Sequence, residues 1–434
     1  MNKMRYLIYL CVICTFCLSS TSSCARKNPP PEDNSDILVS INIIDRNGLS
    51  QTICNPDRLR KFEDVDFFKN QPYQKVLRVY GRDAQGNAQA FITCYYANGQ
   101  PKQYLEIVNN RAYGTYKEWH ANGVLQLEAF IIGGAADIGT ASEQTWLFEG
   151  CSKAWDENGN LIAEIPYAKG VLEGVSIYYH PNGNVWKNVP FHKNAIEGVF
   201  ETFLDDGSIL QTANYSQDRK EGESIRYWPG CKIAAQEIFC SGELISGSYY
   251  NIKGDLITEI KDGNGYRAVF GKEAVIELQE YHQGILEGEI QTFDKNSRLN
   301  RISHVKNNVK HGEELIFYDA IGKQKNLPKL SINWYEGKIQ GIVKTWYRNG
   351  NQESQREMTN NAKNGLATAW YQDGSMMMIE EYDHDKLQRG EYYKKGERIP
   401  ISLINEGKGL ATIFDSEGNF VRKVSYNNGK PEDD

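Results

Sequence analysis

The sequence predicts an all-β protein in which tandem β-hairpins of about 24 residues form an elongated, twisted antiparallel sheet behind a short N-terminal α/β cap. Two regularities of the 434-residue chain predict this fold. Glycine recurs at a period near 24 residues, and an aromatic residue stands five positions after it in eleven of thirteen units. Because 12% of the residues are aromatic, one or two matches are expected by chance. A fixed period of this length is typical of repeat architectures.

The first 23 residues are expected to be an export signal. Lys3 and Arg5 precede an apolar run, 6–18, that is too short to cross a bilayer but has the length of a signal-peptide core. The sequence SSTSSC follows and ends in Cys24. It resembles the lipobox of bacterial lipoproteins, in which the cysteine is acylated. The alternative is an ordinary secretory cleavage near Ser23 that leaves Cys24 as a free thiol.

Residues 24–36 are polar and proline-rich, as expected for a tether behind a lipid anchor on Cys24. In the lipoproteins that the motif resembles, a residue other than Asp after the cysteine, here Ala25, directs the protein to the outer membrane. We therefore expect an exported, membrane-anchored protein. Removal of residues 1–23 leaves a net charge of −9, which argues against nucleic acid or an anionic lipid surface as the main partner.

Residues 37–75 are expected to cap the first hairpin. The apolar run 37–44 predicts a strand, and 55–70 predicts a short helix with Asn55 as its N-cap. The apolar stripe of that helix consists of Leu59, Phe62 and Val65. A terminal cap of this kind covers the otherwise open edge of a repeat array.

The repeat domain spans residues 76–430, and three positions of each unit are recognisable. The first position, which we call the anchor, is occupied by Ala90, Gly114, Gly150, Gly174, Gly198, Gly222, Gly247, Gly288, Gly312, Gly341, Gly365, Gly390 and Gly409. The aromatic column five residues later consists of Tyr95, Trp119, Trp155, Tyr179, Phe203, Tyr227, Phe293, Phe317, Trp346, Trp370 and Phe414. The turn glycines nine residues after the anchor are Gly99, Gly123, Gly159, Gly183, Gly207, Gly350, Gly374 and Gly418.

Each unit is expected to be a β-hairpin. Asn or Asp precedes most turn glycines, and Asn-Gly and Asp-Gly accept the two positive φ angles of a type I′ turn. In one unit the first strand is expected in 175–179 and the second in 184–191, with a looser turn in 192–198 leading to the next hairpin. The anchor glycine either leaves room for a packed neighbour or supplies an unusual φ, and the sequence does not decide between these roles.

The aromatic column has two interpretations. It is a packed spine that covers the apolar face of successive hairpins, or it is an exposed platform for a glycan, a lipid or another chain. The period is interrupted between Gly114 and Gly150 and between Gly247 and Gly288. Such insertions often form the binding face of a repeat protein. The alternatives are a loop without function and a merged degenerate repeat.

The pattern Gly-x4-aromatic-x3-Asn-Gly, over most of residues 76–430, resembles the MORN-repeat variant of bacterial proteins, including antitoxins of a toxin–antitoxin family. Together with the lipobox-like N-terminus, the chain is also similar to conserved envelope lipoproteins of chlamydia-like intracellular bacteria. The resemblance implies the hairpin-repeat fold. MORN-type repeats are associated with phospholipid binding and with dimerisation, so self-association is compatible with the resemblance.

No motif for catalysis is present in the sequence. A nucleophile elbow, a P-loop and a dinucleotide fingerprint are all missing. His120 and His180 follow the aromatic column by one residue, where a solvated turn position is expected. The cysteines after Cys24 contain no CxxC pair and are expected to be scattered buried thiols. We therefore expect no enzyme, no cofactor and no metal site.

The function that the sequence favours is an envelope-anchored lipoprotein that acts as a non-catalytic scaffold or binding surface for another envelope protein. Two alternatives stay open. One is a toxin-neutralising protein like the antitoxins, which requires a cytoplasmic partner and therefore conflicts with the export signal. The other is a glycan- or lipid-binding module, which requires exposed aromatic residues.

Overall fold

The computed structural model describes residues 33–319 and 326–432. The predicted signal peptide 1–23, Cys24 and most of the tether lie outside the described residues. The chain divides into two compact units, Met1–Gly222 and Glu223–Asp434, and the division falls within strand β16 (Arg219–Tyr227). Among the described helices, none has the length and apolar character needed to cross a membrane.

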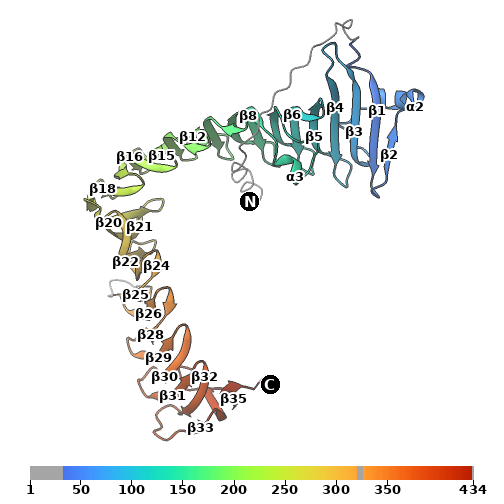
Figure 1. Cartoon of the computed structure of the whole chain (residues 1–434). Helices are drawn as coiled ribbons and strands as arrows, with labels where there is room; N and C mark the ends of the chain where they lie inside the picture. Colours follow the sequence, from blue (N-terminus) through green and yellow to red (C-terminus); the bar gives the residue numbers. More distant parts are fainter. Residues whose placement is uncertain (1–32, 320–325, 433–434) are drawn as a thin grey trace, which may run out of the picture. The chain divides into compact units, whose positions relative to one another are not determined.

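The first unit is an open antiparallel sheet with two short helices (Figure 1). Its sheet begins in the order β2-β1-β3-β4 and then follows the chain, so that each further hairpin pairs with the one before it. The elements are β1 (Leu38–Asp45), β2 (Ser50–Ile53), α2 (Pro56–Glu63), β3 (Tyr73–Arg82), β4 (Ala88–Tyr95), β5 (Pro101–Val108), β6 (Arg111–Trp119), β7 (Leu125–Ile131), α3 (Thr140–Glu143), β8 (Phe148–Trp155), β9 (Leu161–Ala168), β10 (Val171–Leu172), β11 (Gly174–Tyr179), β12 (Val185–His192), β13 (Ala195–Ile196), β14 (Gly198–Phe203) and β15 (Ile209–Ser216).

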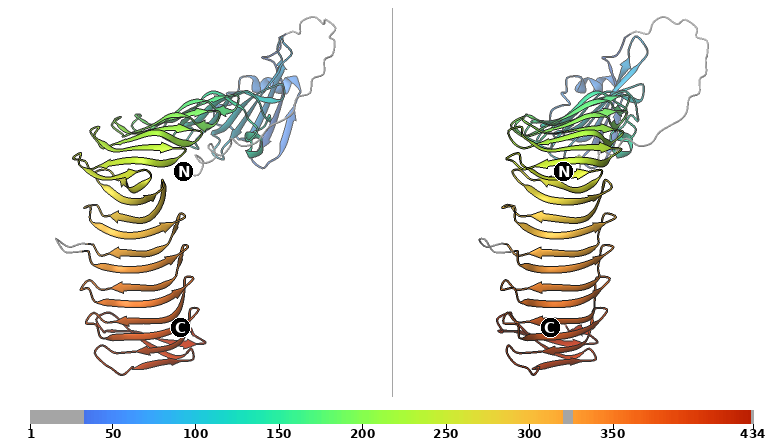
Figure 2. Two further views of the ribbon diagram at one scale, coloured as in Figure 1. Left: turned by 60° about the vertical axis from the view of Figure 1, so that its left-hand side comes forward. Right: turned by 90° about the vertical axis from the view of Figure 1, so that its left-hand side faces the viewer.

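The second unit is likewise an antiparallel sheet, in which most successive strands are joined by tight turns (Figure 2). Its strands are β17 (Ile233–Cys240), β18 (Glu243–Tyr250), β19 (Leu256–Lys261), β20 (Asn264–Phe270), β21 (Val275–His282), β22 (Ile285–Phe293), β23 (Leu299–Lys306), β24 (Val309–Lys310), β25 (Gly312–Phe317), β26 (Pro328–Tyr335), β27 (Lys338–Ile339), β28 (Gly341–Trp346), β29 (Gln352–Thr359), β30 (Ala362–Trp370), β31 (Met376–Asp383), β32 (Lys386–Tyr392), β33 (Ser402–Asn405), β34 (Lys408–Phe414), β35 (Phe420–Asn427) and β36 (Lys430–Pro431). The predicted fold of hairpin repeats is confirmed.

The turn chemistry is the reverse of the prediction. At Asn98-Gly99 only the glycine has a positive φ, 93°, and its N–H donates to Tyr96 O at 2.9 Å. This is a three-residue loop with a glycine bulge, not a type I′ turn. Two consecutive positive φ angles occur instead in the connections that were expected to be looser, for example at Lys193 and Asn194, with 50° and 71°.

The anchor glycines take one or both of the two roles that the sequence left open. Gly150 has a φ of 73°, and a Cβ there would meet no atom within 4 Å, so the backbone angle alone requires glycine. Gly365 has a φ of 108°, and a Cβ there would also clash with the Glu357 carboxylate. That carboxylate accepts the N–H of Leu366 at 3.1 Å. The anchor is therefore a bulge that interrupts the strand, which is why pieces such as β10 precede it.

The cap covers one face of the first strands. Asn55 caps α2 as predicted, and its side chain accepts the N–H of Arg58 at 3.2 Å. The helix is shorter than predicted and ends at Glu63, because residues 64–70 turn back and Asp66 accepts the N–H of Phe68. Leu59 of α2 is buried in a cluster with Ile41 and Val76 of the sheet.

The interruption after Gly114 folds back over the other face of the same strands. We call this the anchor face, because it carries each anchor and the residues two and four positions after it. Residues 133–147, the covering segment, place Trp146 against Tyr116, with ring centroids 4.8 Å apart. Trp146 is 5% exposed and belongs to one cluster with Ile92 and Leu105. The insertion is therefore part of the core and does not project as a loop.

The interruption after Gly247 is a merged repeat, as one of the alternatives proposed. It consists of two hairpins, β18–β19 and β20–β21. Gly265 has a φ of 133°, and Phe270 follows it by five residues, so this glycine acts as an additional anchor. The sequence pattern missed it because the preceding strand, β19, is shortened and the spacing falls out of period.

Candidate functional site

The aromatic column lies at the ends of the first strands of the hairpins. In the pairings of these strands, a register shift falls between the fourth and fifth residues after the anchor, for example between Tyr178 and Tyr179. Tyr95 is 4% exposed, and the other ten members are half-buried. The rings therefore form neither a fully packed spine nor a freely exposed platform.

A second column, one residue after the first, links successive hairpins. Its aromatic and histidine side chains each bond a main-chain carbonyl of the following hairpin. The Tyr96 hydroxyl donates to Trp119 O at 2.7 Å, and the Tyr347 hydroxyl donates to Trp370 O at 2.8 Å. The further bonds of this kind join His120 to Trp155 O, His180 to Phe203 O, Trp228 to Tyr250 O, Tyr318 to Trp346 O and Tyr371 to Tyr393 O.

The solvated role expected for His120 and His180 is therefore wrong. Both imidazoles are half-buried, and each Nε2 lies 2.9 to 3.0 Å from a carbonyl oxygen of the next hairpin. The sequence does not reveal this column, because its residue type varies between Tyr, His and Trp. What its members share is a polar hydrogen at the far end of a planar ring.

A third column stabilises the turn edge. The Asn98 side chain accepts the N–H of Gln100 within its own turn and donates to Ala121 O of the next turn at 2.8 Å. Asn122, Asn182 and Asn349 make the equivalent bonds to the next turn. Because these bonds satisfy main-chain carbonyls at the edge, they fix neighbouring hairpins relative to each other within each unit.

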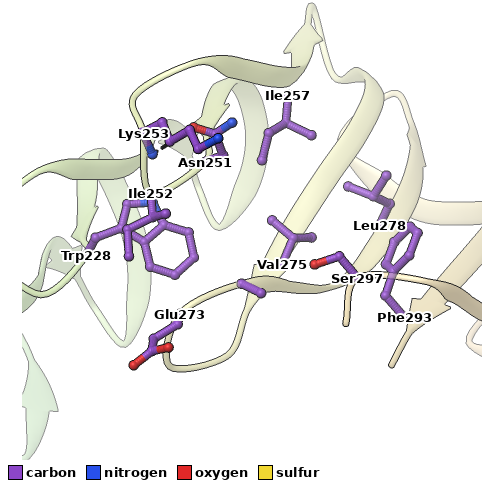
Figure 3. A pocket seen from close by; sticks show the side chains of 11 residues that line it. Trp228, Asn251, Ile252, Lys253, Ile257, Glu273, Val275, Leu278, Phe293 and Ser297 are labelled. Carbon is purple, nitrogen blue, oxygen red and sulfur yellow. Dashed lines mark hydrogen bonds between the residues drawn. The ribbon is translucent and has the colours of Figure 1, made fainter. Parts of the chain in front are cut away.

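The second unit contains an apolar cavity of about 360 Å³ (Figure 3). Turns of three successive hairpins line it, and Trp228, which is 2% exposed, forms part of its wall. Lys253 and Glu273 are its charged lining residues. The amide of Asn251 is occupied by the N–H groups of Lys253 and Asp255 in its own turn. The cavity is an apolar recess with a charged rim and shows no paired catalytic groups.

The described residues bring together no group of three or more His, Cys, Asp or Glu side chains that could hold a metal ion. The five cysteines 54, 94, 151, 231 and 240 are free thiols. The prediction that they are buried is wrong for four of them, which are exposed. Cys94 is half-buried, and burial raises the pKa of its thiol to about 11. Cys151 is exposed because it follows the anchor Gly150 by one residue and lies on the face opposite the anchor face.

The two sheet faces of the first unit differ in character beyond the covering segment. The anchor face between Phe148 and Tyr215 carries partly buried aromatic side chains, among them Tyr178 and Phe200. Its middle strands also carry a cation, Lys187. The opposite face carries ion pairs such as Lys153–Glu164, whose charged atoms are 2.9 Å apart. The anchor face of this stretch therefore carries the partly buried aromatic rings and a lysine, whereas the opposite face carries ion pairs together with the exposed valines Val175 and Val199.

The comparison with curated proteins finds no match. Among solved structures, the chain is similar to TcdB2-TccC3-TEV with 11% identity over 89% of this chain and 21% of that one, at a TM-score of 0.16. A Photorhabdus luminescens Tc holotoxin pore matches with 10% identity over 91% and 26%, at a TM-score of 0.15. A porin-like protein from Bacteroides uniformis matches with 10% identity over 60% and 96%, at 0.14. The chain spans about a quarter or less of the first two, and similarity at these TM-scores says nothing about function.

The family comparison agrees with the geometry of the hairpins. The model of the MORN repeat variant matches residues 112–131, 148–169 and 172–193. Each match covers one turn-linked segment of the first unit: β6–β7, β8–β9, and β10 to β12. These three stretches are therefore MORN-variant repeats.

Proposed function

We propose that this protein is a non-catalytic interaction scaffold that is anchored to the bacterial envelope through a lipid on Cys24. The observation that carries the proposal is the construction of the sheet. Hydrogen bonds from side chains to the main chain of the next hairpin tie the repeats together along the turn edge. Outside the stretches that α2 and the covering segment pack on, the broad faces of the sheet therefore do not depend on a second layer for their hydrogen bonds, and they are free to serve as contact surfaces. MORN repeats are in general modules that bind proteins or membranes, which supports this role.

The N-terminal sequence supports the anchor. A basic start, an apolar run of signal-peptide length and SSTSSC before the polar tether are the features of a lipoprotein leader. The net charge of −9 after removal of the leader disfavours nucleic acid and anionic lipid as partners of the folded part. A protein of the envelope is the partner that fits both features.

The test compares the native protein with the variants Cys24→Ala and Cys54→Ala in cells that are fed a labelled fatty acid. Cys54 is an exposed thiol of the described part and serves as the matched control. We expect the native and Cys54→Ala proteins to take up the label and to localise to the membrane. The Cys24→Ala protein should do neither. Cross-linking with mass spectrometry should then find one envelope protein that is lost with Cys24→Ala. If no form is acylated and the cross-linked proteins are cytoplasmic, the antitoxin-like function replaces this one.

A further inference from the structure

The anchor face of the first unit is covered over its first repeats and uncovered over the next. Over β4 to β7 the covering segment, 133–147, packs on this face through Trp146, Ala136 and Ile138. Beyond Phe148 the strands β9 to β15 make their main contacts only with neighbouring strands of the described chain. Phe148 joins the two stretches, because it belongs to the covered cluster and its ring centroid lies 5.3 Å from that of Tyr167.

The covering segment shows which chemistry this face accepts. Besides its apolar side chains it supplies two carboxylates to polar residues of the anchor face. Asp137 forms an ion pair with Lys75. Glu143 accepts a hydrogen bond from Gln103 Nε2 at 3.2 Å. Gln103 lies opposite Cys94, which follows its anchor by four residues.

Lys187 occupies the register position of Gln103 on the uncovered stretch. It lies opposite Tyr178, which follows the anchor Gly174 by four residues. Its ammonium lies 4.3 Å from the ring centroid of Tyr178 and 4.7 Å from that of Trp186. Burial lowers the pKa of this amine, and among the described residues no carboxylate forms an ion pair with it. A cation that is partly desolvated without an ion-pair partner is favourably placed for a carboxylate brought by another molecule.

We infer that the anchor face between Tyr178 and Tyr215 binds a peptide segment of a partner protein that presents an aromatic side chain and a carboxylate, as the covering segment presents Trp146 and Glu143. The carboxylate pairs with Lys187. The aromatic side chain packs on the half-buried rings of Phe200 and Tyr215, whose centroids are 5.8 Å apart. This inference rests on the proposed scaffold function and names its contact surface.

The charges of the face favour a peptide over a membrane. Surfaces that bind anionic lipid carry clusters of basic residues. The middle strands of this face, β11, β12, β14 and β15, carry one such residue, Lys187, among apolar and small side chains. A single cation surrounded by aromatic rings is suited to one carboxylate next to an apolar side chain, which a peptide provides.

The test uses a synthetic fluorescent peptide with the sequence of residues 133–147 as the probe and the full chain in detergent as the receptor. Fluorescence anisotropy at low ionic strength measures the dissociation constant. We expect binding that becomes about tenfold weaker or more with Lys187→Glu, because the close charge pair is replaced by repulsion. The charge-matched control Lys193→Glu, in an exposed turn at the edge of the sheet, should leave binding unchanged. Lys187→Gln, with an expected intermediate loss, serves if the reversal disturbs folding as judged by circular dichroism.

Variants of the peptide, combined with the variants of the chain, form a double-mutant cycle that tests the same contact. A peptide with Asp137→Asn and Glu143→Gln should bind the native chain about as weakly as the native peptide binds Lys187→Gln. It should lose nothing further against that variant, since the same contact is already gone. A peptide with Trp146→Ala and a chain with Phe200→Ala should each bind more weakly than the native pair.

Three results overturn the inference. The first is no binding of the peptide to the native chain. The second is binding that is insensitive to Lys187→Glu but lost with Lys75→Glu, since the probe then only replaces the native covering segment. The third is binding of phosphatidylglycerol vesicles that depends on Lys187 in the absence of peptide binding. The assay does not involve Cys24, so failure here leaves the anchored scaffold standing with a different contact surface, and failure of acylation leaves this surface standing.

Discussion

Two clusters of the second unit share one arrangement and differ in how they stabilise a buried carboxylate. The first cluster surrounds Tyr249 and the second surrounds Tyr392. In each, a glutamate lies opposite the anchor of the next strand: Glu237 opposite Gly247, and Glu380 opposite Gly390. The equivalent pairs that complete the two clusters are Leu244 and Leu387, Ile260 and Ile404, and Phe239 and Tyr382.

The partners of the two carboxylates differ. Glu237 accepts the Tyr249 hydroxyl at 3.0 Å and forms a two-point contact with Arg267, whose Nε lies 2.7 Å from Oε1. The residue equivalent to Arg267 is Ala411, because each stands two positions after its anchor. Glu380 instead accepts two tyrosine hydroxyls, from Tyr392 at 2.7 Å and Tyr382 at 2.9 Å.

In both clusters the buried carboxylate has two partner residues, and only their identity differs. A buried charge without partners is strongly destabilising, whereas several hydrogen-bonding arrangements are nearly equivalent. In the first cluster, Arg267 supplies the second partner, and the residue equivalent to Tyr382 is Phe239, which has no hydroxyl. In the second cluster, Ala411 replaces the arginine, and the Tyr382 hydroxyl supplies the second partner.

The largest effect is expected for Arg267→Ala. It leaves Glu237, 4% exposed, with one hydroxyl donor. Breaking a buried ion pair costs about 3 kcal/mol at the lower end of the usual range. The lower end applies because 29% of the Arg267 side chain is exposed. Hydrogen exchange of the amides in β17 to β21 measures the local opening free energy.

The control for this prediction is Arg389→Ala. Arg389 is 77% exposed, and its contact with Glu381 is 4.0 Å long, so its loss should leave exchange in β32 within error of the native protein. Equal effects of the two substitutions would show that the Arg267–Glu237 pair does not stabilise the first cluster.

A smaller effect is expected for Tyr382→Phe, which makes the second cluster resemble the first without supplying arginine. Glu380 keeps the Tyr392 hydroxyl and loses one of its two donors. A hydrogen bond to a charged group contributes about 2 kcal/mol, so exchange in β30 to β32 should accelerate accordingly. Tyr335→Phe, at a 55% exposed tyrosine, is the matched control. If both variants exchange alike, the second hydroxyl is not needed.

The exchange of partners can be tested directly by Phe239→Tyr in the Arg267→Ala background. This pair of substitutions reproduces the second arrangement in the first cluster. We expect recovery of about 1 kcal/mol relative to Arg267→Ala alone, since the new hydroxyl restores one donor to Glu237. The same substitution in the native background should give no gain, because Arg267 already occupies the carboxylate. Recovery in both backgrounds would mean that the added volume, not the hydrogen bond, stabilises the cluster.

The hairpins and their spacing were predictable because glycine, the aromatic residue and Asn-Gly act within one unit. The features that were missed depend on contacts between units. Asn98 does not adopt the positive φ of the predicted turn, and its amide is bonded to the next turn. The covering segment lacks the repeat pattern, so its packing on Tyr116 could not be read from periodicity. Lys187 is an ordinary lysine in the sequence, and only the register shows that it matches Gln103.

The smallest effect is a difference in alkaline stability between the two clusters. Burial and the neighbouring carboxylate raise the pKa of Tyr249 and of Tyr392 above the usual value, but the nearby Arg267 opposes the increase only at Tyr249. A pKa that is raised in the folded state adds stability below the unfolded value of about 10, and this stability is lost as the pH rises above it. Both clusters should therefore loosen above about pH 10. Tyrosinate absorbance followed together with circular dichroism should show that Tyr249→Phe changes the alkaline transition less than Tyr392→Phe. The reverse order would show that Arg267 does not limit the increase in the pKa of Tyr249.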